Sequence, residues 1–230
     1  MKHLVTILCG MLMCLSAFSQ APIPVDENGK PIYNDLNARR RSLFELLEIK
    51  PGSIVMLGDN LVDGCEWNEL FDNPAIVNRG IHGDRVAWMG NRIEAITKAK
   101  PAKIFFMAGS QDLVHKTKSK DCVLMIAKLV QQMHQQSPQT KIYVQSILPW
   151  NLNVPAQEAR KESTLNIRID NCNKWLRNWC EGQGYTFVDV ASAMSDADGH
   201  LDARYTWDGV NLNGVGYLVW KEVLDPFINE

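Results

Sequence analysis

Short apolar runs rich in β-branched and aromatic residues alternate with longer stretches of helical periodicity along this chain. The apolar runs that predict strands are 53–57, 75–78, 103–107, 141–146 and 185–189. Runs of this kind suit strands that are buried on both faces of a sheet. The stretches that predict helices are 36–49, 85–98, 119–135, 163–181 and 214–227. Their alternation predicts the α/β class, with a five-stranded parallel sheet in a three-layer α/β/α sandwich.

Proline and glycine separate these predicted elements. Pro51-Gly52 and Pro101 each follow a predicted helix and precede a predicted strand, where proline cannot continue the helix. The proline-containing segment 20–34 is expected to be an extended arm, and the tract 149–157 a long loop after the fourth strand. Because no repeat or interdomain linker is visible, we predict one domain over residues 20–230.

The start of the chain has the three parts of a secretory signal. Lys2 gives a basic start, residues 4–15 are an apolar run, and small residues stand at Ala17 and Ser19. We predict a signal peptide over residues 1–19 that is cleaved near Ser19. The mature protein is then secreted or periplasmic.

A lipoprotein anchor on Cys14 is the alternative interpretation of the same segment. It is not favoured, because Leu12 and Met13 precede that cysteine where small residues are expected.

Composition excludes several classes of function. Of 230 residues, 46% are hydrophobic and 22% charged, and 24 Lys+Arg against 26 Asp+Glu leave a formal charge of −2. This balance gives no basic footprint for nucleic acid, so no nucleic-acid partner is expected. After residue 20 no apolar run reaches the roughly 20 residues of a membrane span. The absence of CxxC, HExxH and a His pair at helical spacing predicts neither a metal nor a cofactor.

Four cysteines lie outside the predicted signal, at positions 65, 122, 172 and 180. Cys172 and Cys180 share one predicted helix and would lie about 12 Å apart, too far for a disulfide. The sequence does not choose among the remaining pairings, and we expect reduced cysteines in the core.

In a parallel sheet of this type, ligands bind beyond the carboxyl ends of the strands. The loops predicted there are 58–66, 80–85, 108–115, 146–153 and 205–213. They contain four distinctive blocks: Met56-Leu57-Gly58-Asp59-Asn60, Asn78-Arg79-Gly80-Ile81-His82-Gly83-Asp84, Ala108-Gly109-Ser110-Gln111-Asp112 and Asp208-Gly209-Val210-Asn211-Leu212-Asn213. In order and spacing these blocks resemble those of the SGNH, or GDSL, hydrolase family, especially its secreted acyl- and acetyl-ester hydrolases. The resemblance implies the flavodoxin-like SGNH fold.

The resemblance also implies a chemistry of acyl transfer. In the family a serine attacks the ester carbonyl, a histidine takes its proton, and an aspartate three residues earlier orients the histidine. Two backbone N–H groups and an asparagine side chain hold the oxyanion. On this chain the nucleophile position is Asn60, the base position Asn211 and the aspartate Asp208. The oxyanion glycine and side-chain donor positions are Gly83 and Gln111.

Asparagine cannot perform either of the two central roles. A carboxamide oxygen is a poor nucleophile at position 60, and the amide of Asn211 does not titrate near neutral pH. Loss of the nucleophile or the base costs a serine hydrolase on the order of 10⁶ in turnover. We therefore expect a catalytically degenerate protein, a pseudoenzyme that binds a small acylated or carbohydrate ligand in the former active-site cleft.

Other residues of these loops are candidates for binding, namely Asp59, His82, Ser110 and Trp207. Trp207 would stack on a sugar ring while neighbouring amides bind its hydroxyl groups. Asp84 is expected to cap the helix that starts at residue 85.

A working esterase with a relocated nucleophile is the alternative. Ser110 or Cys65 would react with His82 as its base and would act on acetylated carbohydrate or other small esters. In the simpler interpretation His82 fills space at the helix start, Ser110 bonds local backbone and Cys65 is a small buried thiol.

Overall fold

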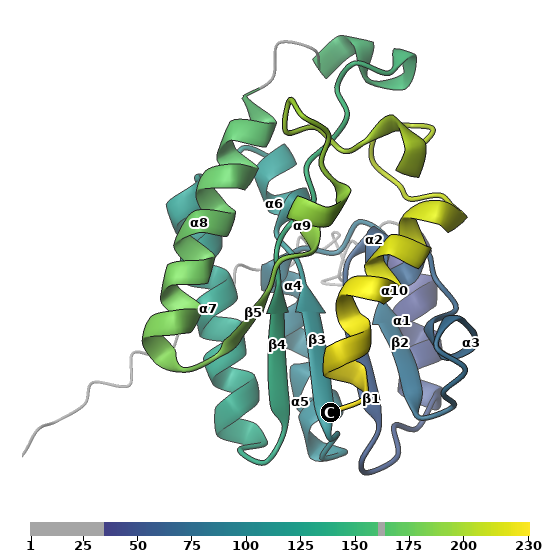
Figure 1. Cartoon of the computed structure of the whole chain (residues 1–230). Helices are drawn as coiled ribbons and strands as arrows, with labels where there is room; N and C mark the ends of the chain where they lie inside the picture. Colours follow the sequence, from purple (N-terminus) through teal and green to yellow (C-terminus); the bar gives the residue numbers. More distant parts are fainter. Residues whose placement is uncertain (1–34, 161–163) are drawn as a thin grey trace, which may run out of the picture.

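The computed structural model describes residues 35–160 and 164–230, and within them the five predicted strands form one parallel sheet (Figure 1). The strands are β1 (Ile54–Gly58), β2 (Ile76–Gly80), β3 (Lys103–Met107), β4 (Lys141–Gln145) and β5 (Thr186–Val188). Their order in space is β2-β1-β3-β4-β5. Gly58 pairs with Gly80 on one side and Met107 on the other, so the first three strands end level with one another.

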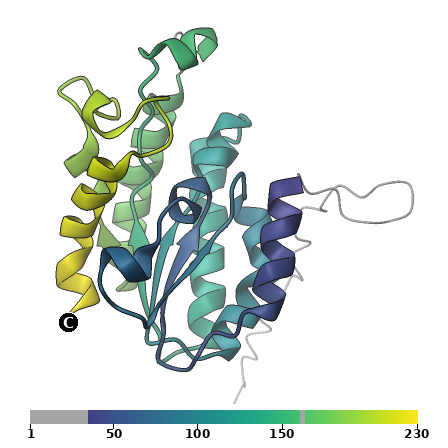
Figure 2. The ribbon, with the colours of Figure 1, turned by 90° about the vertical axis from the view of Figure 1, so that its right-hand side faces the viewer.

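Helices cover both faces of the sheet, which confirms the predicted α/β/α sandwich (Figures 1 and 2). One face packs against α4 (Val86–Met89), α5 (Ile93–Lys98), α7 (Ser119–Gln136) and α8 (Leu165–Gln183). The other packs against α2 (Asn60–Asp63), α3 (Trp67–Leu70), α9 (Val190–Met194) and α10 (Gly214–Ile228). The elements α1 (Asp35–Leu46) and α6 (Ser110–Val114) and the 3₁₀ turns Gly90–Arg92, Pro155–Arg160 and Ala203–Tyr205 complete the described chain.

The two cores follow from the alternation of side chains along each strand. In β1, Val55 and Leu57 point into the core under α7, whereas Ile54 and Met56 point into the core under α10. All five residues of this strand are buried, as the apolar run predicts for a strand covered on both sides.

Two predicted boundaries are wrong. The helix expected over 85–98 is three pieces, α4, the turn Gly90–Arg92 and α5. Gly90 is a poor helix former, and Arg92 leaves the helical backbone region while its side chain reaches the ends of β1 and β2. The loop expected over 149–157 contains the start of the 3₁₀ turn Pro155–Arg160.

The predicted signal peptide and the arm 20–34 lie outside the described residues. In the part of the chain that is described, no helix combines the length and the apolar character that crossing a membrane requires.

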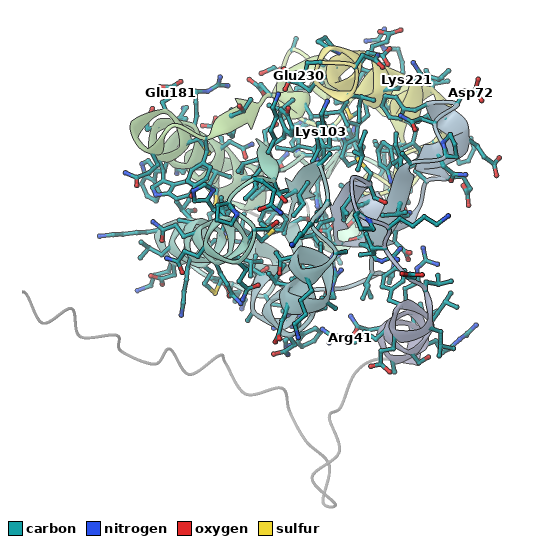
Figure 3. The ribbon with its side chains drawn as sticks, turned by 90° about the horizontal axis from the view of Figure 1, so that it is seen from below. Arg41, Asp72, Lys103, Glu181, Lys221 and Glu230 are labelled. Atoms are coloured by element: carbon teal, nitrogen blue, oxygen red, sulfur yellow. The ribbon has the colours of Figure 1, made fainter. Side chains whose placement is uncertain are left out.

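The last helix is fastened to the amino-terminal end of the sheet. Lys103, the first residue of β3, donates hydrogen bonds from Nζ to the carbonyl oxygens of Phe227 (2.8 Å) and Ile228 (2.9 Å). Figure 3 views this end from below, with Lys103 and Glu230 labelled. A lysine at a helix C-terminus satisfies carbonyl groups that lack helical partners. The attachment fixes α10, whose other end follows the loop with Asp208 and Asn211.

Candidate active site

The candidate site lies at the carboxyl end of the sheet, where α2 packs directly over β1 and β2. Gly58 and Gly80 end these strands, and a side chain at either position would collide with α2. A Cβ on Gly58 would lie 2.4 Å from Val62, and one on Gly80 would lie 2.1 Å from the backbone of Asp63. Glycine therefore allows α2 to start at the strand end and to place Asn60 over the sheet.

Four side chains of the site form one continuous hydrogen-bonded chain. Gln111 Nε2 donates to Asn60 Oδ1 at 3.1 Å, and Asn60 Nδ2 donates to Asn211 Oδ1 at 2.9 Å. Asn211 Nδ2 then donates to Asp208 Oδ2 at 2.7 Å. The structure thus brings together the predicted nucleophile, base, aspartate and oxyanion-donor positions, which come from α2, α6 and the loop before α10.

The direction of this chain is set by Asp208. An ionised carboxylate only accepts hydrogen bonds, so Asn211 must turn its Nδ2 toward Asp208 and its Oδ1 toward Asn60. Asn60 must then offer Nδ2 to Asn211 and Oδ1 to Gln111. Every internal contact is an amide N–H that donates to oxygen, and none of the three amides gains or loses a charge by titration near neutral pH.

Asp208 is held ionised by its surroundings. Burial by itself raises the pKa of Asp208, but hydrogen bonds from Asn211, Val210 and Thr206 outweigh it and leave the pKa below its ordinary value. The backbone N–H groups of Asn211 and Val210 reach Oδ1 at 2.7 and 2.9 Å. Thr206 Oγ1 also donates to the carbonyl oxygen of Asn211 at 2.7 Å, and this contact joins the two ends of the turn that contains Asp208.

The second loop, residues 80–85, carries Gly83, the predicted oxyanion glycine. Ile81 donates its backbone N–H to the carbonyl oxygen of Gly58 at 3.1 Å, and Gly83 follows in a turn with φ +71°. Within residues 35–160 and 164–230, neither the backbone N–H of Asn60 nor that of Gly83 donates a hydrogen bond to the protein. Both groups are therefore able to bind an oxygen atom of a ligand.

A buried ion pair fastens this loop to the strand ends. Arg92 bonds Asp84 through Nη2 at 2.9 Å, and its other N–H groups reach the carbonyl oxygens of Arg79 (2.6 Å) and Gly58 (3.2 Å). The side chain of Asp84 is fully buried and that of Arg92 is 10% exposed. The predicted helix-capping role of Asp84 is wrong, because the N-cap of α4 is Arg85, and Asp84 Oδ1 accepts the N–H of that residue, at 3.2 Å, rather than an N–H of the helix.

Asp112 performs the capping instead, from the third loop. Its Oδ2 accepts the backbone N–H of Val86, the first residue of α4, at 3.1 Å. Burial raises the pKa of Asp112 to about 6, against the lowering effect of this hydrogen bond. The carboxyl group of Asp112 therefore joins the third loop, residues 108–115, to the start of α4, which follows the second loop.

Asp59 is the N-cap of α2 and lies next to Asn60. Its Oδ1 accepts the N–H of Leu61 at 3.2 Å, and its side chain is almost completely buried. Burial, together with the nearby carboxyl groups of Asp112 and Asp84, raises the pKa of Asp59 to about 7 against the lowering effect of the Leu61 N–H. Asp59 thus supports the start of α2 from beneath the site.

The residues of the relocated-nucleophile alternative have other environments. Ser110 is buried, and its Oγ accepts a hydrogen bond from Trp150 Nε1 at 3.1 Å. Burial raises the pKa of the Cys65 thiol to about 12, which disfavours the thiolate. The His82 side chain is exposed, and no hydrogen bond among the described residues joins it to Ser110 or Cys65. The geometry does not favour a relocated catalytic pair.

Trp207 is the other predicted binding residue, and it is 85% exposed beside Asp208. An exposed indole ring offers a stacking surface, unlike Trp67 and Trp150, which are buried. The four cysteines expected in the core are buried there with free thiols.

A segment after β4 closes one side of the site. Asn151 donates its backbone N–H to the carbonyl oxygen of Gly209 at 2.8 Å, and Gln157 Nε2 donates to the carbonyl oxygen of Asp208 at 2.9 Å. Trp150 contacts the third loop through Ser110. Residues 149–160 therefore contact both the loop that carries Gln111 and the loop that carries Asp208. We call the hydrogen-bonded side chains of Gln111, Asn60, Asn211 and Asp208 the amide chain.

Two grooves lie away from these residues. The larger, about 560 Å³, runs between α8 and residues 189–199, and the smaller, about 350 Å³, lies between α1 and α5. Among the residues with a described structure, no three His, Cys, Asp or Glu side chains are arranged to hold a metal ion.

Arg92, Thr206 and Gln157 were not identified from the sequence. Arg92 stands eight residues after its partner Asp84, whereas side chains that contact each other on a regular helix are three or four residues apart. Thr206 is the one with a local signal, because a threonine two residues before Asp-Gly favours a side-chain-bonded turn.

Comparisons with known proteins found a matching family and similar sequences. The model of the GDSL-like lipase/acylhydrolase family matches residues 57–219. Platelet-activating factor acetylhydrolase IB subunit alpha2 of Rattus norvegicus is 25% identical over 175 residues, which cover 73% of this chain and 72% of that relative. N-acylneuraminate cytidylyltransferase of Escherichia coli O18:K1:H7 is 28% identical over 203 residues, covering 86% of this chain and 44% of that relative.

A solved structure shows the same fold. The GDSL-like lipase of Bacteroides thetaiotaomicron aligns with a TM-score of 0.72 at 20% identity, covering 84% of this chain and 96% of that one. The matched family region begins at the end of β1 and extends into α10. It therefore includes Asn60, Gln111, Asp208 and Asn211 and the loops that carry them.

Proposed function

This chain belongs to the GDSL-like lipase/acylhydrolase family, and from that premise we propose that it binds a small acylated or carbohydrate ligand without cleaving it. The ligand occupies the position at which an acylhydrolase of this family holds its ester.

One observation carries the proposal, the hydrogen-bonded chain from Gln111 through Asn60 and Asn211 to Asp208. Hydrolysis by the family's route needs a nucleophile that loses a proton and a base that accepts it. The amides of Asn60 and Asn211 do neither. The hydrogen bond between them also occupies Nδ2 of Asn60 and Oδ1 of Asn211, the two side-chain atoms that face each other in the site.

The same groups are suited to recognition of neutral oxygen atoms. The backbone N–H groups of Asn60 and Gly83 and the second N–H of Gln111 Nε2 can donate to a carbonyl or hydroxyl oxygen. Each such hydrogen bond contributes about 0.5–1.5 kcal/mol, and exposed Trp207 adds a ring on which a sugar can stack. Because the amide chain is already fully oriented by Asp208, little side-chain entropy is lost on binding.

The ligand class follows from this donor set and agrees with the names of relatives. One matched relative is named for an acetylhydrolase activity, and another for an N-acylated sugar, N-acylneuraminate. An acyl carbonyl and sugar hydroxyl groups are the oxygen atoms that the site offers to bind.

The proposal includes export. The basic start, apolar run and small residues near Ser19 support cleavage of a signal peptide and a secreted or periplasmic protein. N-terminal sequencing of the protein recovered after expression with its native start tests this part, with Gln20 as the expected first residue.

Hydrolysis of p-nitrophenyl acetate tests the loss of catalysis. We expect the wild-type protein and the Asn60→Ala variant to release p-nitrophenol at the same rate, close to that of buffer. A wild-type rate well above buffer that Asn60→Ala abolishes would refute the proposal.

Binding is tested separately with N-acetylglucosamine, which carries both an acyl carbonyl and sugar hydroxyls. Titration followed by NMR should shift the side-chain amide resonances of Asn60, Gln111 and Asn211, and Trp207→Ala should weaken the affinity several-fold. Trp175→Ala is the matched control, because Trp175 is a half-exposed tryptophan on α8. Equal losses in the two variants, or no shift at the three amides, would contradict the proposed site.

A further inference from the structure

Arg160 ends the segment 149–160 that closes one side of the amide chain. Its guanidinium carbon lies 5.2 Å from the ring centroid of Trp150, a distance typical of a cation–π contact. Trp150 in turn donates its Nε1–H to Ser110, the residue next to Gln111. One indole ring therefore separates the guanidinium of Arg160 from the third loop of the site.

A second connection fixes Arg160 from the opposite side. Its Nη1 donates to Gln157 Oε1 at 2.9 Å, while Gln157 Nε2 donates to the carbonyl oxygen of Asp208 at 2.9 Å. Buried Gln157 thus joins the arginine to the last loop of the site. Arg160 is held between the two loops that carry Gln111 and Asp208, and its position does not depend on one contact.

The guanidinium has more donors than these contacts use. Arginine carries five N–H groups, and within residues 35–160 and 164–230 Arg160 uses one of them, on Gln157. Arg160 is an exposed residue. A planar, oriented guanidinium with free N–H pairs is the group that binds carboxylate or phosphate in bidentate fashion.

We propose that Arg160 determines ligand specificity by binding an anionic group, a carboxylate or a phosphate, on the ligand held at the amide chain. The inference rests on the proposed function and narrows its ligand class from acylated sugars to acidic ones. The neutral amides and backbone N–H groups bind the acyl and hydroxyl oxygens, and Arg160 binds the charge at the edge of the site.

The acidic groups nearby leave this charge available. The carboxylate of Asp208 already accepts from Asn211, Val210 and Thr206. Glu158 lies on the same 3₁₀ turn as Arg160 and is exposed. No salt bridge joins Arg160 to an acidic side chain within residues 35–160 and 164–230.

The test compares sugars that differ by one anionic group. Isothermal titration with N-acetylglucosamine, N-acetylmuramic acid and N-acetylglucosamine 6-phosphate measures the neutral sugar, a carboxylate and a phosphate on the same ring. We expect at least one anionic sugar to bind the wild-type protein about tenfold more tightly than the neutral one, a preference that shrinks as NaCl is raised from about 0.05 to 0.5 M. The carboxylate and phosphate arms then show which anion is preferred.

Three variants assign the preference to Arg160. Arg160→Gln, which keeps a polar side chain for Gln157, should lose the preference for the anion and keep its affinity for N-acetylglucosamine. Arg160→Lys should retain part of the preference, because the charge remains without the bidentate edge. Arg177→Gln is the matched control, an arginine stacked on Phe187 at 4.7 Å, and should behave as the wild type.

The possible failures are distinguishable. Equal affinity of wild-type protein for neutral and anionic sugars, or a preference that survives Arg160→Gln, would overturn the role of Arg160 and leave the proposed function standing. Failure of the wild-type protein to bind any of the three sugars would contradict the proposed ligand class, and the inference with it.

Discussion

The Nδ2 atom of Asn60 lies 2.9 Å from Oδ1 of Asn211, a side-chain hydrogen bond between residues 151 positions apart in the sequence. The resemblance of the sequence blocks implies that an acylhydrolase of this family has a serine and a histidine at these two positions. On the proposed function, two amides that form a hydrogen bond stand in place of the reacting groups. The consequences of this exchange for activity, stability and pH dependence can be measured.

Asp208→Asn tests whether one carboxylate orients the amide chain. The variant replaces an acceptor of four hydrogen bonds with a group that also donates, so we expect a loss of about 1–3 kcal/mol in the free energy of unfolding. Urea denaturation measures this loss. Asp198→Asn, a substitution in the exposed turn at residues 196–199, is the control and should change stability by less than about 0.5 kcal/mol. Equal effects of the two substitutions would contradict the role of Asp208.

Asp59 should make stability depend on pH near neutrality. Its pKa is raised by burial to about 7 in the folded protein, so between pH 4 and 7 the folded state holds a proton that the unfolded chain has released. The free energy of unfolding should therefore fall as pH rises through this window and level off above it. Asp112, with a pKa of about 6, adds the same trend.

Asp59→Asn removes this proton while keeping an acceptor for Leu61. Denaturation at pH 5 and pH 8 should show a smaller difference between the two pH values in the variant than in the wild type, by on the order of 1 kcal/mol. An unchanged difference would mean that Asp59 does not titrate in this range.

The buried pair of Asp84 and Arg92 should be strongly required for folding. Arg92→Met leaves the carboxylate of Asp84 without its main partner and removes the guanidinium donors to the carbonyl oxygens of Arg79 and Gly58, and should cost about 3–5 kcal/mol. Because the penalty comes from the unpaired charge, Asp84→Asn combined with Arg92→Met should cost less than the sum of the single substitutions. Additive losses in a double-mutant cycle would contradict a buried interacting pair.

Ser110→Ala separates a structural serine from a relocated nucleophile. Loss of the acceptor for Trp150 Nε1 should lower the free energy of unfolding by about 1 kcal/mol and leave p-nitrophenyl acetate hydrolysis unchanged. Cys65→Ala should likewise leave the rate unchanged. A rate that falls in either variant would establish a relocated catalytic site.

Much of the fold could be predicted because it follows from local patterns of apolar and polar residues. The buried runs that became β1 and β3 are apolar throughout, and α7 and α8 are long enough for their periodicity to be recognised. Helices such as α2 and α6, with four and five residues, are too short to show a period. Their positions follow from glycine at the strand ends and from contacts between distant loops.

The residues of the site also divide into those that the sequence predicts and those that it does not. The block order placed Asn60, Gln111, Asp208 and Asn211 at neighbouring strand ends, and the structure joins all four. Arg160 could not be found from the sequence, since its placement depends on Trp150 and Gln157, which contact different loops.

The most direct test of the central claim restores the missing groups. The double variant Asn60→Ser with Asn211→His should hydrolyse p-nitrophenyl acetate at least about 10³-fold faster than the wild-type protein, because Asp208, Gly83 and Gln111 remain in position. Asn60→Ala with Asn211→His is the matched control and should stay at the wild-type rate. A folded double variant as inactive as this control, or a wild-type protein that already turns over the ester at a comparable rate, would contradict the account.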